Sequence, residues 1–405
     1  MGALKHVRGV DNSALVPKYW SRKYLEDSFE KDPLAPFYGS IIATEYNLKG
    51  QKGDTIEVPI VGLLTGAGVT DDGDYDGDIG ALPLYNMPVV IHEHGRAAGL
   101  NGKMTEKSSA LRTRTLTMKG LTKWRAAFNA RAVIDALSGL KLHYLGGNVL
   151  GASGLALDGN SAQIQCVNQV LPNYTAGTTA MRYYAGGQVA ATGAYTGRVA
   201  DITSLNKVSY VFGTKVIEAV RRMAEKTVDS SGNLISPIER VKVNGRMVYV
   251  MLISQEQAKD LKADSAWRTG HENADIRGLE NSIFSGALGI WDGVLLVETD
   301  LLHSRLGKGG ITATEFFDAT SYACTSGEAV HRALFLGENA VAFALGEAPE
   351  YAEFYADHAK TKWAARVSSI YGISTIAKYE SSTNTAEVVA DSEMGCIVVD
   401  TAVVP

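Results

Sequence analysis

Two short stretches of the sequence carry side chains that could ligate a metal ion, and the first of them is acidic. Asp72, Asp74 and Asp76 alternate with Gly and Tyr, as at the start of an EF-hand calcium loop. Such a loop needs Glu at its twelfth position, where Pro83 stands, and no helical pattern flanks it. The stretch therefore predicts a solvated loop tip, with a weak surface cation site as the alternative.

The second stretch is His92-Glu93-His94. On a β-strand the two imidazoles would share one face, an arrangement that can bind a metal ion when further ligands lie close. The neighbouring sequence offers no third ligand. An ordinary strand is therefore the preferred interpretation, and no metal site is predicted.

Signatures of enzyme chemistry are missing from the sequence. Ser153 lies in Gly-Ala-Ser-Gly, which breaks the nucleophile-elbow pattern, and there is no P-loop, zinc signature or dinucleotide-binding glycine motif. The three cysteines, Cys166, Cys324 and Cys396, are too far apart for a metal knuckle or a disulfide framework, which fits a reducing compartment. We therefore predict no catalytic residue, no cofactor and no metal.

The overall composition is that of a soluble globular protein. The chain has 405 residues, of which 45% are apolar and 20% charged, enough for one large core or two interlocked cores. Its net charge of −5 does not indicate a general nucleic-acid binder. The sequence has no signal-peptide h-region and no apolar run near the roughly 18–20 residues that span a bilayer. No membrane association is expected.

The first half of the chain contains three different segments. Residues 1–45 are polar with scattered aromatics, and Pro33 and Pro36 would interrupt a long helix. We expect an arm that docks its aromatics elsewhere, the alternative being a helix packed on its own domain. Residues 53–95 are two β-prone stretches around a Gly- and Asp-rich tip, which predicts a long hairpin. This segment holds eight carboxylates and no Lys or Arg.

The third segment reverses the sign of the charge. From Lys103 to Arg131 there are eight basic residues against one acidic residue, Glu106. Apolar residues recur at helical spacing, Thr105 can serve as N-cap, and Gly139 stands where a C′ glycine belongs. The pattern predicts one helix of more than 30 residues, or roughly 50 Å at 1.5 Å per residue.

The second half of the chain has the signals of an α/β unit. Residues 140–204 are rich in Gly and Tyr and predict either an irregular β excursion or a mobile loop. A helix is expected near 205–227, and the apolar run 247–253 predicts a strand buried on both faces. Ser254 to Gln257 form a capping box, Asp292-Gly293 predicts a hairpin turn, and the last 40 residues predict two more strands.

The order of these pieces resembles the major capsid proteins of tailed bacteriophages, which have the Hong Kong 97-type fold. The similarity is greatest to the capsid protein family first described from a podovirus with a giant virion RNA polymerase, and it spans most of the chain apart from 140–204. The similar residues are Gly53 to Ile56, Leu64 to Val69, Asp76 to Asp78 and the run to Ala97, Met104, Arg112, Leu121 to Trp124, Leu137 to Gly139, Phe284 to Gly286, Gly289 to Val294 and Gly337 to Ala340.

The resemblance implies an α+β fold with five parts. They are an N-terminal arm (1–45), an extended hairpin called the E-loop (46–102), a peripheral domain (103–227), an axial α/β domain (228–330), and a return to the peripheral domain with C-terminal strands (331–405). Within the peripheral domain, the long helix (103–139) is the spine and 140–204 is an insertion.

The implied function is self-assembly into the pentamers and hexamers of an icosahedral head that encloses double-stranded DNA. Head-to-tail contacts close rings, and a hairpin that lies over the neighbouring subunit would supply one such contact. The E-loop residues expected at this contact are Val58, Ile60, Leu63, Leu64, Asp71, Asp72, Asp74, Asp76 and Asp78.

The charges suggest a second contact. The hairpin carries −8 and the helix segment 8 − 1 = +7, so the two could steer assembly between neighbours. Alternatively the basic helix contacts packaged DNA, or both charged faces are simply solvated. The helix residues expected at such a contact are Lys107, Arg112, Arg114, Lys119, Lys123, Arg125 and Arg131.

Partners and location follow from the same resemblance. We expect copies of the chain itself, scaffolding and portal proteins and non-specific contact with DNA, with a decoration protein left open. The expected location is the virion shell, with assembly in the host cytoplasm. The alternatives are an encapsulin-like compartment shell, a minor virion or tail protein, and, from another class, a hydrolase or carbohydrate-binding protein built around 140–204.

Overall fold

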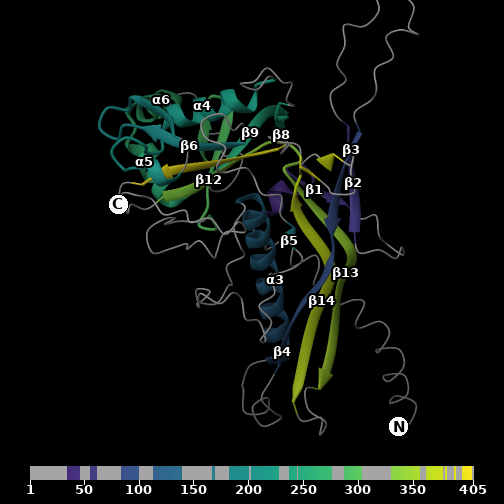
Figure 1. The fold of residues 1–405 in the computed structure, drawn as a ribbon. Coiled ribbons are helices and arrows are strands. Elements are labelled where there is room, and N and C mark those ends of the chain that lie inside the picture. Colours follow the sequence, from purple (N-terminus) through teal and green to yellow (C-terminus); the bar gives the residue numbers. More distant parts are fainter. Residues whose placement is uncertain are drawn as a thin grey trace, which may run out of the picture.

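The structure is a computed structural model with two visibly different parts. Figure 1 shows a long ribbon of strands with helix α3 (Thr113–Ser138) beside it, and a more compact body that contains the other helices. The residues described are 34–45, 55–61, 84–99, 113–138, 167–168, 182–199, 202–227, 237–243, 245–275, 287–302, 330–355, 362–376, 379–380, 387–388 and 395–403.

The ribbon is a five-stranded sheet in the order β1-β13-β14-β4, with β5 paired to β14. β13 and β14 are antiparallel along most of their length, and their register shifts around Glu347. β4 pairs antiparallel with β14, whereas β1 pairs in parallel with β13. The bounds are η1 Ala35–Phe37, β1 Ile42–Glu45, β4 His92–Gly99, β5 Val167–Asn168, β13 Val341–Tyr355 and β14 Trp363–Thr375.

Helix α3 packs one face of the ribbon and extends from its far end to the compact body (Figure 1). Near its start, Met118 and Leu121 contact Tyr351 and Trp363 of the ribbon. Nearly every side chain of its last two turns is buried, because these turns lie in the main core. The predicted spine helix is confirmed from 113 to 138, and the predicted Thr105 cap and Gly139 lie outside the described residues.

The predicted hairpin is confirmed at its base. β2 (Thr55–Val61) and β3 (Leu84–Val90) pair antiparallel from Thr55↔Val90 to Val61↔Leu84. They belong to a four-stranded sheet in the order β16-β15-β3-β2, with β15 at Tyr379–Glu380 and β16 at Glu387–Val388. The acidic tip lies outside the described residues.

The compact body is an eight-stranded sheet in the order β10-β11-β9-β12-β17-β6-β7, with β8 paired to β9. Helices α4, α5 and α6 contribute to the core on one of its faces, and the end of α3 contributes to the core on the other. The bounds are β6 Tyr183–Gln188, β7 Tyr195–Val199, η4 Ile202–Ser204, α4 Thr214–Ala224, β8 Val241–Val243, β9 Arg246–Ile253, α5 Gln255–Ala263, α6 Ser265–Asp275, β10 Ala287–Trp291, β11 Val294–Glu298, β12 Val330–Leu336 and β17 Cys396–Ala402.

Several local predictions are confirmed in this body. β9 is buried along its last six residues, as its continuous apolar run indicated. Ser254 caps α5 with both hydrogen bonds of the capping box, the second through Gln257. Asp292 and Gly293 both have positive φ, 47° and 77°, as a two-residue hairpin turn between β10 and β11 requires.

The strand pairing groups residues that the predicted domain ranges had separated. Residues 183–224, assigned to the peripheral domain as insertion and helix, form β6, β7 and α4 of the compact body. β12, which lies in the predicted return to the peripheral domain, is a central strand of the same sheet, and so is β17, one of the predicted C-terminal strands. β6 pairs with β17, a strand far along the chain, so local patterns could not reveal this neighbour.

The glycines in β6 explain why its sequence looked irregular. A Cβ on Gly187 would lie 2.3 Å from the carbonyl carbon of Tyr210, which is backbone that cannot move aside cheaply. Gly186 is similarly close to the carbonyl oxygen of Gly197. These glycines permit close backbone approach within a fully buried strand rather than forming a loop.

The described end of the predicted arm packs on its own subunit. Leu34, Phe37 and Ile41 are buried in the main core, and the ring of Tyr38 meets that of Phe343 edge-on. For these residues the alternative, packing on the same domain, holds. The rest of the arm lies outside the described residues.

Candidate assembly surfaces

The E-loop residues are only partly within the described chain. Ile56 and Val58 lie on one face of β2 and pack with Met87 and Val89 of β3 against the ribbon. Val58 is therefore half covered by its own subunit, and its contact with a neighbour stays a prediction. The described residues do not include Leu63, Leu64 or the five Asp residues of the tip. The side chain of Ile60 is not described either.

The basic residues of α3 do not form one surface. Lys119 and Lys123 are exposed, whereas Arg131 is half-buried and donates to the carbonyl oxygen of Leu301. Arg125 is only 2% exposed, and its guanidinium lies 4.6 Å from the centre of the Tyr371 ring. Contact of Arg125 with a neighbour or with DNA is therefore wrong, because the side chain is part of the interior. The side chains of Lys107, Arg112 and Arg114 lie outside the description.

Of the His92-Glu93-His94 stretch, His94 packs among aromatic side chains. Its ring stacks on Phe128 at a centroid distance of 4.2 Å and on Trp124 at 5.5 Å, and its Nδ1 lies 3.1 Å from the hydroxyl of Tyr371. Burial, followed by the positive charge of Arg125, lowers the pKa of His94 to about 4. His92–Gly99 form strand β4, as predicted. Among the described residues, no group of three His, Cys, Asp or Glu could hold a metal ion.

This lowered pKa makes stability depend on pH. Between pH 4 and 6.5 the unfolded chain binds a proton at His94 and the folded chain does not, so stability rises with pH across this window. We expect the effect to be on the order of 2 kcal/mol, allowing for partial exposure of the ring. Replacing His94 with Phe should remove most of the slope when the free energy of unfolding is measured from pH 4 to 7. An unchanged slope would contradict this role.

The buried pair Arg332–Asp400 joins the end of α3 to the sheet of the compact body. Both side chains are completely buried, and Nε and Nη2 of Arg332 donate to the two oxygens of Asp400 at 2.8 and 2.7 Å. Nη1 donates to the carbonyl oxygen of Ser138, the last residue of α3, at 2.6 Å. The hydroxyl of Tyr183 donates to Asp400 at 3.0 Å. One guanidinium thus fixes the end of the spine helix against the centre of the sheet.

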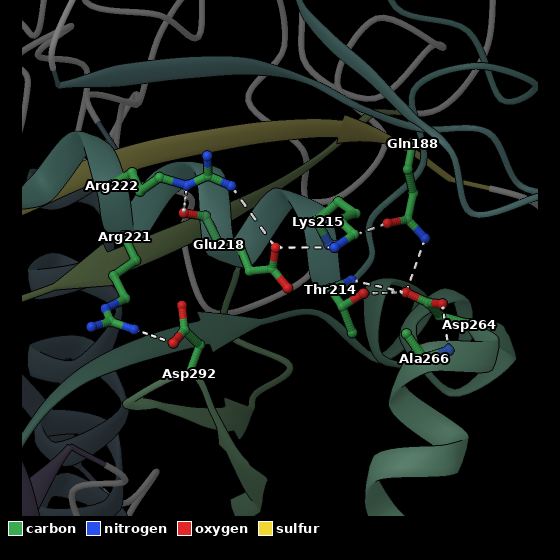
Figure 2. A network of polar contacts seen from close by, with 9 residues as sticks. All are labelled: Gln188, Thr214, Lys215, Glu218, Arg221, Arg222, Asp264, Ala266 and Asp292. Carbon is green, nitrogen blue, oxygen red and sulfur yellow. Dashed lines mark hydrogen bonds and ion pairs between the residues drawn. The ribbon is translucent and has the colours of Figure 1, made fainter.

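A second carboxylate, Asp264, caps two helices at once (Figure 2). Its Oδ2 accepts hydrogen bonds from the amide and the hydroxyl of Thr214, at the start of α4, and its Oδ1 accepts from the amide of Ala266 in α6. Gln188 donates to Asp264 at 3.0 Å and accepts from the amide of Lys215. Burial would raise the pKa of Asp264, but the hydrogen bonds from Thr214, Gln188 and Ala266 outweigh it and lower the pKa.

Gly213, which precedes α4, makes this arrangement possible. As a glycine it has no side chain with which to cap the helix, and its backbone is extended. A Cβ there would lie 2.1 Å from the side-chain nitrogen Nε2 of Gln188. The capping groups therefore come from β6 and from the α5–α6 corner, which locks three elements together.

A match to a family model covers residues 12–405 and carries the description phage capsid protein. The chain belongs to the phage capsid protein family. It is a phage capsid protein, a structural subunit and not an enzyme. The hydrolase, carbohydrate-binding and encapsulin-like alternatives are set aside for this reason.

Solved structures with a similar fold agree with this family. The capsid of Ralstonia phage GP4 matches with a TM-score of 0.62 and 19% identity, covering 90% of this chain and 88% of that one. The Cyanophage Pam1 capsid matches with a TM-score of 0.60 and 16% identity over 93% of both chains. The capsid of Helicobacter pylori bacteriophage KHP30 matches with a TM-score of 0.58 and 14% identity, covering 89% of this chain and 86% of that one. No curated protein matches the chain significantly.

These likenesses establish the Hong Kong 97-type fold of the capsid protein. The predicted α+β fold and the predicted family are thereby confirmed, while the podovirus subgroup stays a prediction. No helix among the described residues is long and apolar enough to cross a membrane.

The far end of the ribbon gives the capsid protein an open face. Phe354 is 40% exposed and pairs across the sheet with Ala364. Tyr351, three residues earlier, faces α3, so Phe354 points to the opposite side of the sheet. Arg366, two residues along from Ala364, shares that side and is half exposed. The base of the hairpin packs on this same side of the sheet nearer the compact body, through Ala342 and Ala344.

Sequence reasoning missed the residues that hold the capsid protein together. Arg332 and Asp400 stand in two apolar strands, which was a usable signal, because charges inside such runs need a partner. Asp264 directly precedes a helix, so an N-cap could have been predicted there. Nothing in the sequence indicated that Asp264 would also cap α4.

Proposed function

We propose that copies of this capsid protein assemble head-to-tail into pentamers and hexamers of a shell that encloses double-stranded DNA. The observation that supports this most directly is the combination of a hairpin packed on its own subunit at its base and an exposed aromatic side chain, Phe354, at the far end of the ribbon. Two different surfaces of this kind suit head-to-tail contacts, which close rings.

The hairpin of one subunit would cover the ribbon of the next. Phe354 offers apolar area on the receiving face. Arg366, which is half exposed and lies 4.0 Å from Glu350 of its own subunit, offers a cation to the acidic hairpin. At about 25 cal/mol per Å² each such contact is modest after association entropy, but repetition around a ring stabilises the whole.

The exposed Lys119 and Lys123 support the electrostatic part of the proposal. They remain available to the acidic hairpin of a neighbour or to packaged DNA, in contrast to Arg125. Scaffolding and portal proteins, a decoration protein and assembly in the host cytoplasm belong to the proposal as well, by analogy with other members of the family.

We expect the purified protein to form closed shells, or pentamers and hexamers, in electron micrographs, and to assemble faster at low salt than at high salt by light scattering. Phe354→Asp should reduce shell formation at least tenfold, because burying the new carboxylate would cost several kcal/mol. Leu116→Asp is the matched control, since Leu116 is a similarly exposed apolar residue on α3. A chain that never assembles, even with lysate as a source of scaffold, would refute the proposal.

A further inference from the structure

A buried cation stands in the interface where helix α3 lies along strands β14 and β4 (Figure 1). Arg125 of α3 is 2% exposed, and its guanidinium carbon lies 4.6 Å from the centre of the Tyr371 ring. The ring compensates only part of the cost of burying the charge, because it carries no net charge of its own. In the described part of the chain, Nη1 of Arg125 has no hydrogen-bond partner. A guanidinium buried in this way needs a negative charge close by.

No carboxylate among the described residues forms an ion pair with Arg125. On α3 itself, Asp135 is ten residues further along, which corresponds to about 15 Å. On β4, Glu93 is next to His94 and therefore points to the side of the sheet opposite to α3. On β13, Glu353 already accepts two hydrogen bonds from side chains near the far end of the ribbon. The counter-ion of Arg125 is therefore not one of these carboxylates.

The other ionisable groups on this side of the sheet add positive charge or none. Burial, followed by the positive charge of Arg125, lowers the pKa of His94 to about 4, so its ring is neutral at pH 7. Arg96 follows two residues later on the same side of β4, with its guanidinium 5.6 Å from the centre of the Trp124 ring. The surroundings of Arg125 are therefore electropositive, which favours an anion from solution.

Ser369 of β14 supplies a second unsatisfied group in the same place. It pairs with His94 across the sheet and stands two residues before Tyr371, so its side chain faces α3 beside Arg125. Ser369 is 3% exposed, and its hydroxyl has no hydrogen-bond partner among the described residues. Buried hydroxyls are normally bonded. One acceptor bound between Arg125 and Ser369 would satisfy both side chains.

We propose that a small monovalent anion such as chloride binds between α3 and β14, held by the guanidinium of Arg125 and the hydroxyl of Ser369. The guanidinium supplies the opposite charge and an N–H donor, and the serine supplies an O–H donor. A doubly charged phosphate would leave one negative charge uncompensated in the interior, so the monovalent ion is preferred. The bound ion links the spine helix to the ribbon.

Unfolding by urea in two sodium salts tests this site, because urea adds no anion. The free subunit, at a concentration too low for shells to form, is unfolded at pH 7 in sodium chloride and in sodium isethionate at equal ionic strength. Isethionate is too bulky to replace chloride in a closed site. For a Kd of about 50 mM, raising chloride from about 10 to 500 mM should lower the unfolding equilibrium constant roughly tenfold. Isethionate should not reproduce this decrease.

Three variants assign the response to the proposed site. Arg125→Met removes the charge while keeping an unbranched side chain in the interior, and it should respond equally to the two salts. Ser369→Ala should shift the chloride response to several-fold higher concentrations, because the ion loses one donor. Lys226→Met, at an exposed cation after the end of α4, is the matched control and should keep the response of the unmodified protein.

Each outcome supports or overturns the anion site. An equal response of the unmodified protein to both salts, or a chloride response that survives Arg125→Met, would overturn it and leave a bridging water as the occupant. If Arg125→Met does not fold, Ser369→Ala decides, since an unchanged chloride response would overturn the site and a shifted one supports it. The measurements use the subunit alone, so a failure to form shells would contradict the proposed function and not this site.

Discussion

Replacing Arg332 with Ala should lower the free energy of unfolding of the subunit by about 3–5 kcal/mol. The substitution leaves the carboxylate of Asp400 completely buried and, among the described residues, with the hydroxyl of Tyr183 as its one remaining side-chain partner. It also removes the donor to the carbonyl oxygen of Ser138 at the end of α3. The loss is large because a buried charge without its counter-ion keeps its full desolvation penalty. Denaturant unfolding followed by circular dichroism measures it.

Two further variants make this prediction specific. Arg332→Met combined with Asp400→Leu removes both charges, and should be more stable than Arg332→Ala by at least 2 kcal/mol or so. Lys262→Met breaks an exposed ion pair with Glu298, whose atoms are 3.9 Å apart, and should change stability by less than about 1 kcal/mol. If Arg332→Ala behaves like Lys262→Met, the buried pair does not contribute to stability by holding α3 on the sheet.

Replacing Asp264 with Ala should cost about 2–3 kcal/mol, because two helices lose a cap of about 1 kcal/mol each and Gln188 loses an acceptor. The loss of stability caused by Asp264→Ala depends on pH. The pKa of Asp264 is lowered in the folded state, so its stabilisation is fully present above the usual Asp pKa of about 3.9 and is lost as the pH falls through the lowered value. Unfolding of both proteins should therefore be measured at pH 7 and again near pH 3.

The difference between the proteins should shrink at the lower pH. Asp264→Asn keeps one acceptor oxygen and loses the charge, so we expect an intermediate loss. Asp300→Ala, at an exposed carboxylate, is the matched control and should change little. A loss at Asp264 that is the same at both pH values would mean that shape, and not the ionised carboxylate, holds the two helices.

Local signals in the sequence predicted local structure well. Ser254 and Gln257 form the capping box expected of them, and Asp292-Gly293 makes the expected turn. Each of these features depends on residues within four positions of one another, so the chain itself carries the information. The hairpin base from Thr55 to Val90 was predictable for the same reason, since turn residues and β-prone flanks lie in one segment.

Features that depend on distant partners were not predictable in this way. Arg125 was expected at the surface because the basic residues around it looked like one charged face. Its burial is set by Tyr371 on β14, which no helical pattern reveals. β6 was expected to be irregular because Gly186 and Gly187 usually mark turns, whereas close contact with Tyr210 and Gly197 is what needs them here. The sequence alone does not reveal that Ile290 and Tyr195 lie on the outer strands of the sheet, because this depends on the strand order.

The strand order of the compact body also has a consequence for folding. β17 lies between β12 and β6, although it is the last strand in the chain. Until β17 is synthesised, β12 and β6 have no partner on their inner sides, and the sheet cannot close. Strand pairing between distant segments forms slowly, and until it forms the nascent chain carries unpaired strand edges that are prone to aggregation.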